Sequence, residues 1–329
     1  MKVGVLGAGA IGCWLGGRLA HLGMEVLLVG RPWLQEAVAR HGLELVDLDG
    51  SAVRVRPLVQ TSPTDLASCD VVLVTVKGSD TETAGRQLTT CLEPGTPVVS
   101  FQNGLRNVSR LEAAMPGHLV LPGMVFFNVV RQQDHRFVKG TGGPLAVANH
   151  PAAGELVQTL RAAGFDVLQR SDMLRVMSTK LFFNLNNAIN ALSDLPLVEE
   201  LADPGYRAVL AAAMDEAARV FKAAGRPPVR LGTLIPAVVP MVLRLPTPLF
   251  RVVARSMLAM DPAARSSTWE DLTRGRKTEI DDLNGEVSRL GRKMGVPTPV
   301  NDRLVELVRE AEVRGGPRPV PAAELWTSV

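Results

Sequence analysis

A glycine-rich hexapeptide near the N-terminus constrains the fold of this chain more than any other feature. It follows the apolar segment 2–6 (KVGVL), precedes a helical pattern at 11–22, and consists of Gly7, Ala8, Gly9, Ala10, Ile11 and Gly12. In such a GxGxxG turn the glycines permit a tight bend, close approach of a pyrophosphate, and close packing of helix on strand. The N–H groups at the helix N-terminus then face the phosphates. The sequence predicts a dinucleotide site here, and a turn needed only for packing is the alternative.

The remainder of the first half alternates short β-branched runs with helical patterns. The runs at 25–29, 71–76, 97–101 and 119–127 are apolar enough for strands that are buried on both faces. This alternation predicts a parallel sheet of βαβ units. The Gly-rich segment 136–148 predicts an antiparallel pair that closes the sheet.

Strand patterns end near residue 170, and long helical patterns follow. The sequence therefore predicts an α/β protein with a Rossmann-type dinucleotide-binding domain at 1–170 and an all-helical domain at 171–329. Four prolines within 231–259 predict broken or kinked helices in that segment. The Pro-rich tail from Gly315 onward is expected to be loosely ordered.

Composition excludes several classes of protein. The chain has 36 Lys and Arg against 33 Asp and Glu, 4% aromatic residues and no dense basic run, which argues against nucleic-acid binding. Its three widely spaced cysteines suit neither a disulfide framework nor a metal site. Prolines and glycines interrupt the longest uncharged stretch, 113–130, so we expect no membrane span. The uncharged run 3–17 resembles a secretory signal, but the glycine motif explains it better, and a cytoplasmic protein is expected.

Three further residues follow predicted strands and are candidates for the cofactor site. The second strand ends in Val29-Gly30-Arg31, where a carboxylate would favour NAD; Arg31 instead suits the 2′-phosphate of NADP(H). Lys77 and Asn103 follow the runs at 71–76 and 97–101, and parallel strands bring their carboxyl ends to one edge. Lys77 is thus a candidate for the cofactor's phosphate or ribose, and Asn103 for the nicotinamide or the substrate. All three residues could also be ordinary loop positions.

An unusual helical pattern, 172–192, carries four asparagines within seven residues. Asparagine is a poor helix former and needs partners when it is buried. At helical spacing Lys180, Asn184 and Asn187 share one face that is bordered by apolar residues, which would lower the pKa of the lysine and make it a proton donor. Alternatively, Lys180 reaches water and the asparagines bind helix backbones.

A second candidate region runs from 266 to 290. Ser267 lies in the sequence SSTWED, and Glu279 lies in KTEIDDLNG. An apolar helical stripe at 280, 283, 287 and 290 places Glu279, Asp282 and Glu286 beside it, which by itself suggests only a solvated acidic face.

Together these motifs resemble the ketopantoate reductase (2-dehydropantoate 2-reductase) family over nearly the whole chain. The shared parts are GxGAxG, VTVK, QNG, KLxxN, SSTWED and KTEIDDLNG. The resemblance implies a helical domain like the C-terminal domain of 6-phosphogluconate dehydrogenase, and NADPH-dependent reduction of 2-dehydropantoate to pantoate on the way to pantothenate and coenzyme A. It implies that the residues of the glycine turn, Arg31 and Lys77 bind NADP(H), and that Asn103 contacts both cofactor and substrate. It also implies that Lys180 is the catalytic acid, that Asn184 and Ser267 bind substrate, and that Glu279 orients cofactor or substrate.

The chain departs from the family pattern around the substrate. Ala188 stands where the family commonly has a second asparagine, and Asn187 is the best substitute by helical geometry, with Asn186 and Asn190 as alternatives. The expected partner is a small 2-oxo acid bound between the domains, with a homodimer as one candidate assembly. The alternatives are a β-hydroxyacid dehydrogenase, a relative acting on another 2-oxo acid, and a non-catalytic NADP(H)-binding regulator.

Overall fold

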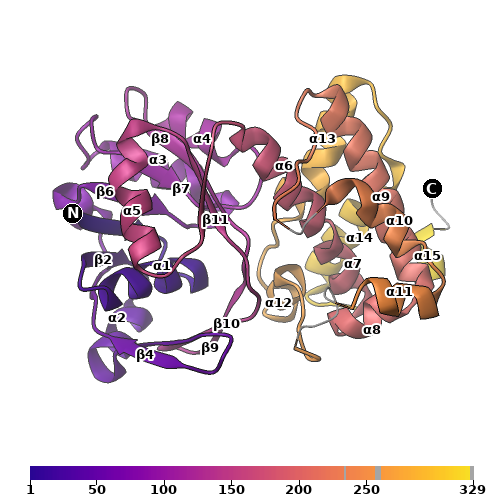
Figure 1. Ribbon diagram of the computed structural model, residues 1–329, viewed down its shortest axis with the longest axis horizontal. Helices are drawn as coiled ribbons and strands as arrows, with labels where there is room; N and C mark the ends of the chain where they lie inside the picture. The colour runs from indigo at the N-terminus through magenta and orange to yellow at the C-terminus, as the bar shows by residue number, and fades with distance from the viewer. Residues whose placement is uncertain (233–234, 256–260, 327–329) are drawn as a thin grey trace. The chain divides into compact units, whose positions relative to one another are not determined.

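The computed structural model describes residues 1–232, 235–255 and 261–326. The chain divides into two compact units, Met1–Met173 and Leu174–Val329. All the β-strands in the described residues lie in the first unit, and the second unit is built from helices (Figure 1). The predicted fold class, a Rossmann-type domain followed by a helical domain, is confirmed.

The first unit is built around an eight-stranded sheet in the order β12-β11-β8-β7-β6-β1-β2-β5. Neighbouring strands run parallel except β11 and β8, which are antiparallel. The strands are β1 (Lys2–Leu6), β2 (Glu25–Val29), β5 (Leu58–Gln60), β6 (Val71–Val74), β7 (Val98–Ser100), β8 (Val120–Val125), β11 (Leu145–Ala148) and β12 (Val167–Arg170). The apolar runs expected to form buried parallel strands do so, whereas β5 and β12 were not predicted.

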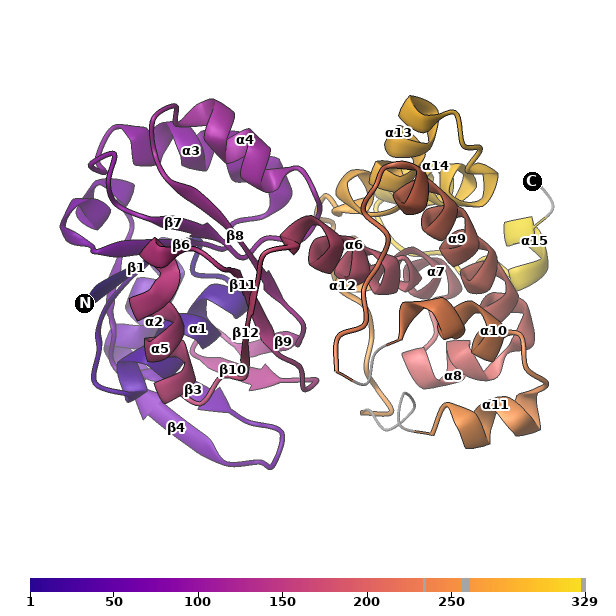
Figure 2. The same ribbon diagram turned by 45° about the horizontal axis from the view of Figure 1, so that its top comes forward.

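Helices cover both faces of this sheet, as Figure 2 shows. One face is covered by α1 (Ala10–His21), α2 (Pro32–His41) and α5 (Gly154–Ala162), and the other by α3 (Thr81–Thr89) and α4 (Asn107–Ala114). Side chains alternate along β1, so Val3 and Val5 enter the first core while Leu6 enters the second. Burial on both faces fixes the strand register and therefore where each strand ends.

A separate four-stranded sheet corrects one prediction. Its order is β4-β3-β10-β9, formed by β3 (Leu43–Val46), β4 (Ala52–Val55), β9 (Val129–Gln133) and β10 (Arg136–Lys139). The segment 136–148 was expected to form one antiparallel pair, but β10 pairs with β9 and β3, whereas β11 pairs with β8 and β12. The two-residue connection from β9 to β10 makes a local hairpin, which takes the antiparallel partner that β11 was expected to supply.

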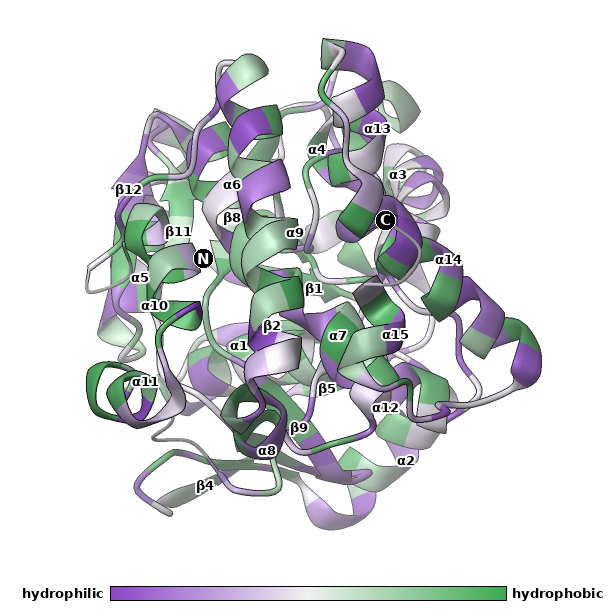
Figure 3. Ribbon diagram, turned by 90° about the vertical axis from the view of Figure 1, so that its right-hand side faces the viewer, coloured by the Kyte–Doolittle hydropathy of each residue, from purple (hydrophilic) through white to green (hydrophobic). Residues whose placement is uncertain are grey.

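The second unit surrounds the long helix α9 (Pro204–Ala223), which packs against α8, α10, α13 and α14. Figure 3 shows hydrophobic and hydrophilic residues alternating along helices such as α14, whose apolar side is buried. The other helices are α6 (Met173–Asn184), α7 (Asn186–Ser193), α8 (Leu197–Ala202), α10 (Val239–Leu243), α11 (Thr247–Val253), α12 (Ser267–Thr273), α13 (Asn284–Met294), α14 (Pro299–Arg314) and α15 (Ala322–Trp326). No helix in the described residues has the length and hydropathy needed to cross a membrane.

Two regions of this unit differ in how well they were predicted. The described part of 231–259 consists of short helices separated at prolines, as expected; residues 233–234 and 256–259 lie outside the described residues. The tail was expected to be loosely ordered, and this is wrong for its described part. The N–H of Val320 donates to the carbonyl of Leu192 over 2.8 Å, Tyr206 donates to the carbonyl of Val320 over 3.0 Å, and Leu325 is buried. These tertiary contacts outweigh the local preference of a Pro-rich sequence.

Candidate active site

The glycine turn lies between β1 and α1, and its geometry fits a dinucleotide phosphate. Gly7 has φ +100°, and a Cβ there would lie 2.6 Å from the backbone nitrogen of Val76. A Cβ on Gly12 would lie 2.5 Å from the carbonyl oxygen of Gly7. On Gly9, by contrast, the nearest atom would be 3.9 Å away, and Gly9 offers the helix N-terminus no side-chain cap. The turn therefore leaves open the space that a pyrophosphate would fill at the start of α1.

The strand order brings the predicted cofactor residues of this unit to one edge of the sheet. Strands β7, β6, β1 and β2 are consecutive neighbours and run parallel. Asn103 follows β7, Lys77 follows β6, the glycine turn follows β1, and Arg31 follows β2. Carboxyl ends of parallel strands meet at one edge, where doubly wound folds bind their ligands.

Arg31 lies immediately beyond a contact between β2 and the glycine turn. A Cβ added to Gly30 would lie 2.9 Å from the Cβ of Ala8, so this backbone packs directly against the turn. The backbone nitrogens of Gly7 and Ala8 both donate to the carbonyl of Val29. Arg31 is exposed at the N-cap position of α2, and no carboxylate stands at the end of β2. An exposed guanidinium at this place suits a phosphate on the adenosine ribose.

A buried glutamine, which was not among the predicted site residues, fixes the loops that carry Lys77 and Asn103. Gln102 Nε2 donates to the carbonyl of Val76 over 3.0 Å and to Oγ1 of Thr81 over 2.8 Å. Thr81 in turn donates to Asn107, whose amide donates to the carbonyl of Asn103. Gln102 thus ties the end of β6 to the end of β7. The QNG motif contains this residue, but only tertiary structure shows what its amide binds.

Helix α6 carries Lys180 and Asn184 one turn apart. A single helix was expected over 172–192, whereas α6 ends at Asn184 and α7 begins at Asn186. The helix breaks where asparagines replace apolar residues of the pattern. Asparagine is unfavourable within a helix because its side chain hydrogen-bonds to nearby backbone groups in non-helical conformations. Lys180 is half-buried, and burial lowers the pKa of its ammonium group to about 8. A lysine with this pKa exists in both protonation states near neutral pH, as proton transfer requires.

The three asparagines left as alternatives have different surroundings. Asn190 is fully buried: its amide donates to Leu195 and Glu200, and its oxygen accepts the N–H of Ser266 over 2.8 Å. Asn186 is directed toward Glu200, with 3.5 Å between its Nδ2 and Oε2. Asn187 makes a long contact of 3.5 Å from Nδ2 to Oγ of Ser267. The structure thus brings two predicted substrate residues, Asn187 and Ser267, side by side and engages Asn190 within the protein.

Helices α7 and α12 pack along their lengths and hold this pair in place. Ser266 caps α12 by accepting the N–H of Trp269, and its hydroxyl donates to the carbonyl of Asn187 over 3.0 Å. At the other end, Trp269 Nε1 donates to Asp194 over 2.6 Å. Asp194 ends α7 in the left-handed conformation with φ 54°. The contacts come from α7 positions three and four residues apart, so a single helix face presents them.

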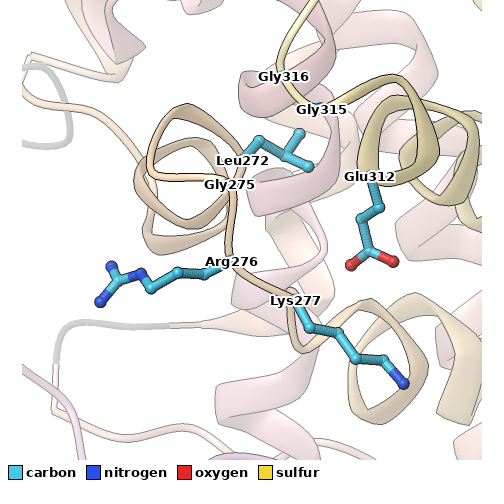
Figure 4. Close-up of a pocket in the computed structure, with 7 residues that line it drawn as sticks. All are labelled: Leu272, Gly275, Arg276, Lys277, Glu312, Gly315 and Gly316. Carbon is cyan, nitrogen blue, oxygen red and sulfur yellow. The ribbon is translucent and has the colours of Figure 1, made fainter.

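Glu279 precedes the short 3₁₀ turn Ile280–Asp282 and is half-buried. Thr278 anchors it, because Glu312 accepts both the N–H and the hydroxyl of Thr278, over 2.7 and 2.6 Å. Figure 4 shows Glu312 opposite the loop that carries Lys277, in a pocket that contains no predicted site residue. The expectation of a solvated acidic face here is wrong, because Asp282 and Glu286 are both buried. Burial of Glu286 is compensated by an ion pair of 2.6 Å to Arg289.

Family models match both units of the chain. Residues 3–152 match the model described as ketopantoate reductase PanE/ApbA, and residues 172–312 match the model of its C-terminal domain. The chain belongs to the ketopantoate reductase family. It is therefore an enzyme of an oxidoreductase family, and the resemblance drawn from the sequence motifs is confirmed. Ketopantoate reductases use NADPH, in accord with the expected cofactor.

Relatives of this family member match 95% or more of the chain. The 2-dehydropantoate 2-reductase of Halobacterium salinarum is 31% identical over 325 residues, covering 96% of this chain and all of the relative. A crystal structure of a PanE/ApbA family ketopantoate reductase from Ralstonia eutropha JMP134 is 30% identical, with a TM-score of 0.84, covering 96% of this chain and 99% of that one. A D-mandelate dehydrogenase, solved with NADH and anilino(oxo)acetate, shares the fold at 23% identity, with a TM-score of 0.81 and coverage of 95% and 99%.

Proposed function

We propose that this ketopantoate reductase family member reduces 2-dehydropantoate to pantoate with NADPH, a step of pantothenate and coenzyme A biosynthesis. The observation that carries the proposal is the position of the half-buried Lys180 amine, one helical turn from Asn184 in α6, where burial lowers its pKa to about 8. Family models matched over both units support the same reaction. Curated relatives named 2-dehydropantoate 2-reductase support the substrate.

The residues at the strand ends of the first unit would hold the cofactor. The glycine turn and the N-terminus of α1 would bind the pyrophosphate, and Arg31 the 2′-phosphate. Lys77 would bind the cofactor, and Asn103 would contact both the nicotinamide and the substrate. Glu279, in the second unit, is proposed to orient cofactor or substrate. NADPH, when bound, supplies the hydride that the reduction requires.

Lys180 is proposed to move the proton of the reaction. As the 2-oxo group takes up hydride at carbon, negative charge develops on its oxygen, and the ammonium of Lys180 donates a proton to that oxygen. The product is a secondary alcohol, and the neutral amine regains its proton from water. Because the pKa of Lys180 is lowered, the ammonium is a stronger acid than an exposed lysine would be, which favours the transfer.

Asn184, Asn187 and Ser267 are proposed to bind the substrate. Their amide and hydroxyl groups can donate hydrogen bonds to a carboxylate and accept from a hydroxyl, the two polar groups of ketopantoate besides the ketone. Asn187 would replace the asparagine that the family pattern places at Ala188. Its side chain lies 3.5 Å from Ser267, which places two donors close enough to bind one carboxylate.

The departure at Ala188 supports a second candidate, a relative that reduces a different 2-oxo acid. Alanine cannot donate the hydrogen bond that an asparagine would, so the polar groups recognised near it could differ. The proposal also extends to a cytoplasmic location, to the absence of nucleic-acid partners and to a homodimer. The three cysteines, all free thiols, are consistent with a reducing compartment. Size-exclusion chromatography with light scattering tests the dimer.

The deciding experiment follows NADPH oxidation with ketopantoate and a panel of other 2-oxo acids and, in separate reactions, NADP⁺ reduction with a panel of β-hydroxyacids. We expect the highest kcat/KM with ketopantoate. A higher value with another 2-oxo acid would favour the second candidate, and oxidation of a β-hydroxyacid with NADP would indicate a β-hydroxyacid dehydrogenase. NADPH binding without turnover of any compound would identify a regulator and overturn the enzymatic proposal.

A further inference from the structure

A buried glutamate on α8 lies behind the proposed substrate residues and belongs to none of the motifs that identify the family. Glu200 is 0% exposed, and its Oε2 accepts a hydrogen bond of 2.9 Å from Nδ2 of Asn190. A carboxyl group buried this deeply needs partners, because an unpaired buried charge is strongly unfavourable. Its partners show what it holds in place.

A chain of hydrogen bonds leads from Glu200 through Asn190 to Ser266, the residue directly before Ser267. Asn190, whose amide donates to both Glu200 and the carbonyl of Leu195, accepts the N–H of Ser266 at its Oδ1 over 2.8 Å. Ser266 donates to the carbonyl of Asn187 over 3.0 Å and caps the first turn of α12, which begins with Ser267. The same hydrogen bonds therefore fix the backbone at both Asn187 and Ser267. The hydrogen bond from Asn190 Nδ2 to Glu200 restricts the orientation of the amide group. Glu200 therefore also affects where Asn190 Oδ1, the acceptor of the Ser266 N–H, points.

We propose that Glu200 is a positioning residue for the substrate site, acting through Asn190 on the Asn187–Ser267 pair. This inference rests on the proposed function, because it takes Asn187 and Ser267 as substrate ligands. Glu200 touches neither of these two side chains in the described hydrogen bonds, so its effect is indirect. Two residues, Asn190 and Ser266, connect Glu200 to Ser267.

The surroundings of Glu200 favour a neutral carboxylic acid. Burial raises its pKa to about 8. Within the described residues, its Oε1 and the Oδ1 of Asn186 are both buried without a hydrogen-bond partner, and a proton on the carboxyl group would supply a donor there. Charged and titratable groups nearby on α7, α8 and α9 have other partners or are exposed: Asp194 binds Trp269, Glu199 is exposed, Asp203 caps Gly205, Tyr206 binds Val320, and Arg207 donates to main-chain carbonyls.

A pair of substitutions separates positioning from simple stabilisation. Glu200→Gln keeps the acceptor for Asn190 and is neutral, so we expect KM for the 2-oxo acid within about twofold of wild type. Glu200→Leu removes the side-chain acceptor of Asn190 and leaves only the Leu195 carbonyl, so we expect KM to rise about tenfold or more, with a smaller change in kcat and an unchanged Kd for NADPH. Glu199→Leu, at the exposed neighbouring position, is the matched control and should leave all three values unchanged.

A merely structural role predicts a different result. Glu200→Leu would then lower the folded fraction and the apparent kcat while leaving KM as in wild type, and this outcome would overturn the proposal. Equal KM increases in the Gln and Leu variants would also overturn it, because they would show that the Asn190 contact is not what matters. If Glu200→Leu does not fold, Asn190→Ala breaks the same chain at its next link, with the same two outcomes.

Hydrogen exchange keeps this test independent of the enzymatic activity. In Glu200→Leu the amide of Ser266 should exchange faster than in wild type, while amides near Gln102 in the other unit should not change. A wild-type protein that turns over no 2-oxo acid would refute the proposed function, yet faster exchange at Ser266 would still establish the link from Glu200. Unchanged exchange at Ser266 would refute the positioning role even in an active enzyme.

Discussion

The two units position their proposed ligand groups differently: the first relies mainly on its backbone, and the second on side chains. At the edge of the sheet, the backbone of the glycine turn offers the proposed phosphate site. The nearby loops are held by three neutral side chains that hydrogen-bond to one another: Gln102, Thr81 and Asn107. In the helical unit, side chains on α6, α7 and α12 present the donors, and the network behind them ends on the carboxyl group of Glu200. The network of Gln102, Thr81 and Asn107 contains no titratable group, whereas the helical unit contains two groups with a pKa of about 8.

This difference matches the two proposed roles, cofactor binding in the first unit and proton transfer in the second. A cofactor that is common to many enzymes can be held by backbone N–H groups, whose strength does not depend on pH. Proton transfer needs a group that changes charge, and burial tunes that group. Substitutions in each half therefore test the contrast.

The largest effect is expected from Lys180→Ala. Loss of the proton donor should lower kcat by about 10²- to 10⁴-fold, while the Kd of NADPH stays near wild type. In the wild-type enzyme, kcat/KM for reduction should fall about tenfold per pH unit above a pKa of about 8, because the ammonium is the active form. Lys293→Ala, on the exposed side of α13, is the control. Near-normal turnover by Lys180→Ala would refute the assignment of the acid.

The cofactor half should be most sensitive at Gly9. Its backbone conformation, φ −82° and ψ −161°, is open to alanine, and no protein atom lies closer than 3.9 Å to the added Cβ. Gly9→Ala should therefore fold normally but raise the Kd of NADPH at least about tenfold by filling the phosphate space. Thermal denaturation and fluorescence titration measure the two quantities. Gly95→Ala, at an exposed glycine with open space, is the matched control; equal NADPH affinity in both variants would remove the phosphate role of the turn.

Arg31→Ala should separate the two nicotinamide cofactors. Removing a charge-assisted contact to the 2′-phosphate should weaken NADPH about 10- to 100-fold and leave NADH nearly unchanged. Arg40→Ala, an exposed arginine in the last turn of the same helix, should change neither affinity. Titration with both cofactors checks the prediction, and equal weakening of NADPH and NADH would contradict it.

The remaining expected effects are on stability rather than on binding or turnover, and they differ in their dependence on pH. Gln102→Leu should destabilise the fold by about 1–3 kcal/mol at every pH, because it leaves buried polar groups without partners. Glu200 behaves differently: its pKa is raised from 4.5 to about 8, so the wild-type protein loses stability as the pH rises from about 4.5 through about 8. Glu200→Gln should remove this loss. Denaturant unfolding at about pH 5 and pH 8 tests both, and a parallel shift of the two variants would contradict the contrast.

The cofactor half was the more predictable from the sequence because its determinants are local. A GxGxxG turn after a strand has few other uses, and parallel strands bring their carboxyl ends together. The strand pattern alone therefore placed Arg31, Lys77 and Asn103 at one edge. The amide partners of Gln102 could not be placed, because they depend on how two loops fold toward each other.

The helical half was predictable in its residues but not in its connections. Helical spacing put Lys180, Asn184 and Asn187 on one face and favoured Asn187, yet it left Asn186 and Asn190 as alternatives. That choice depends on Ser266, which is 76 residues from Asn190, and on the helix break after Asn184. No periodicity in the sequence reports such contacts. The same is true of the tail, where Tyr206 and Leu192 supply partners from far along the chain.

The bond between Val320 and Leu192 has a practical consequence for anyone who shortens this protein. Leu192 lies on α7, two residues beyond Asn190, so the segment around Val320 buttresses the helix that carries the proposed recognition residues. We expect a protein truncated before Val320, or cut by a protease just ahead of it, to lose this support for α7. Its selectivity among 2-oxo acids should then fall, while NADPH binding by the first unit should not change. Preparations for ligand screening should therefore retain this stretch.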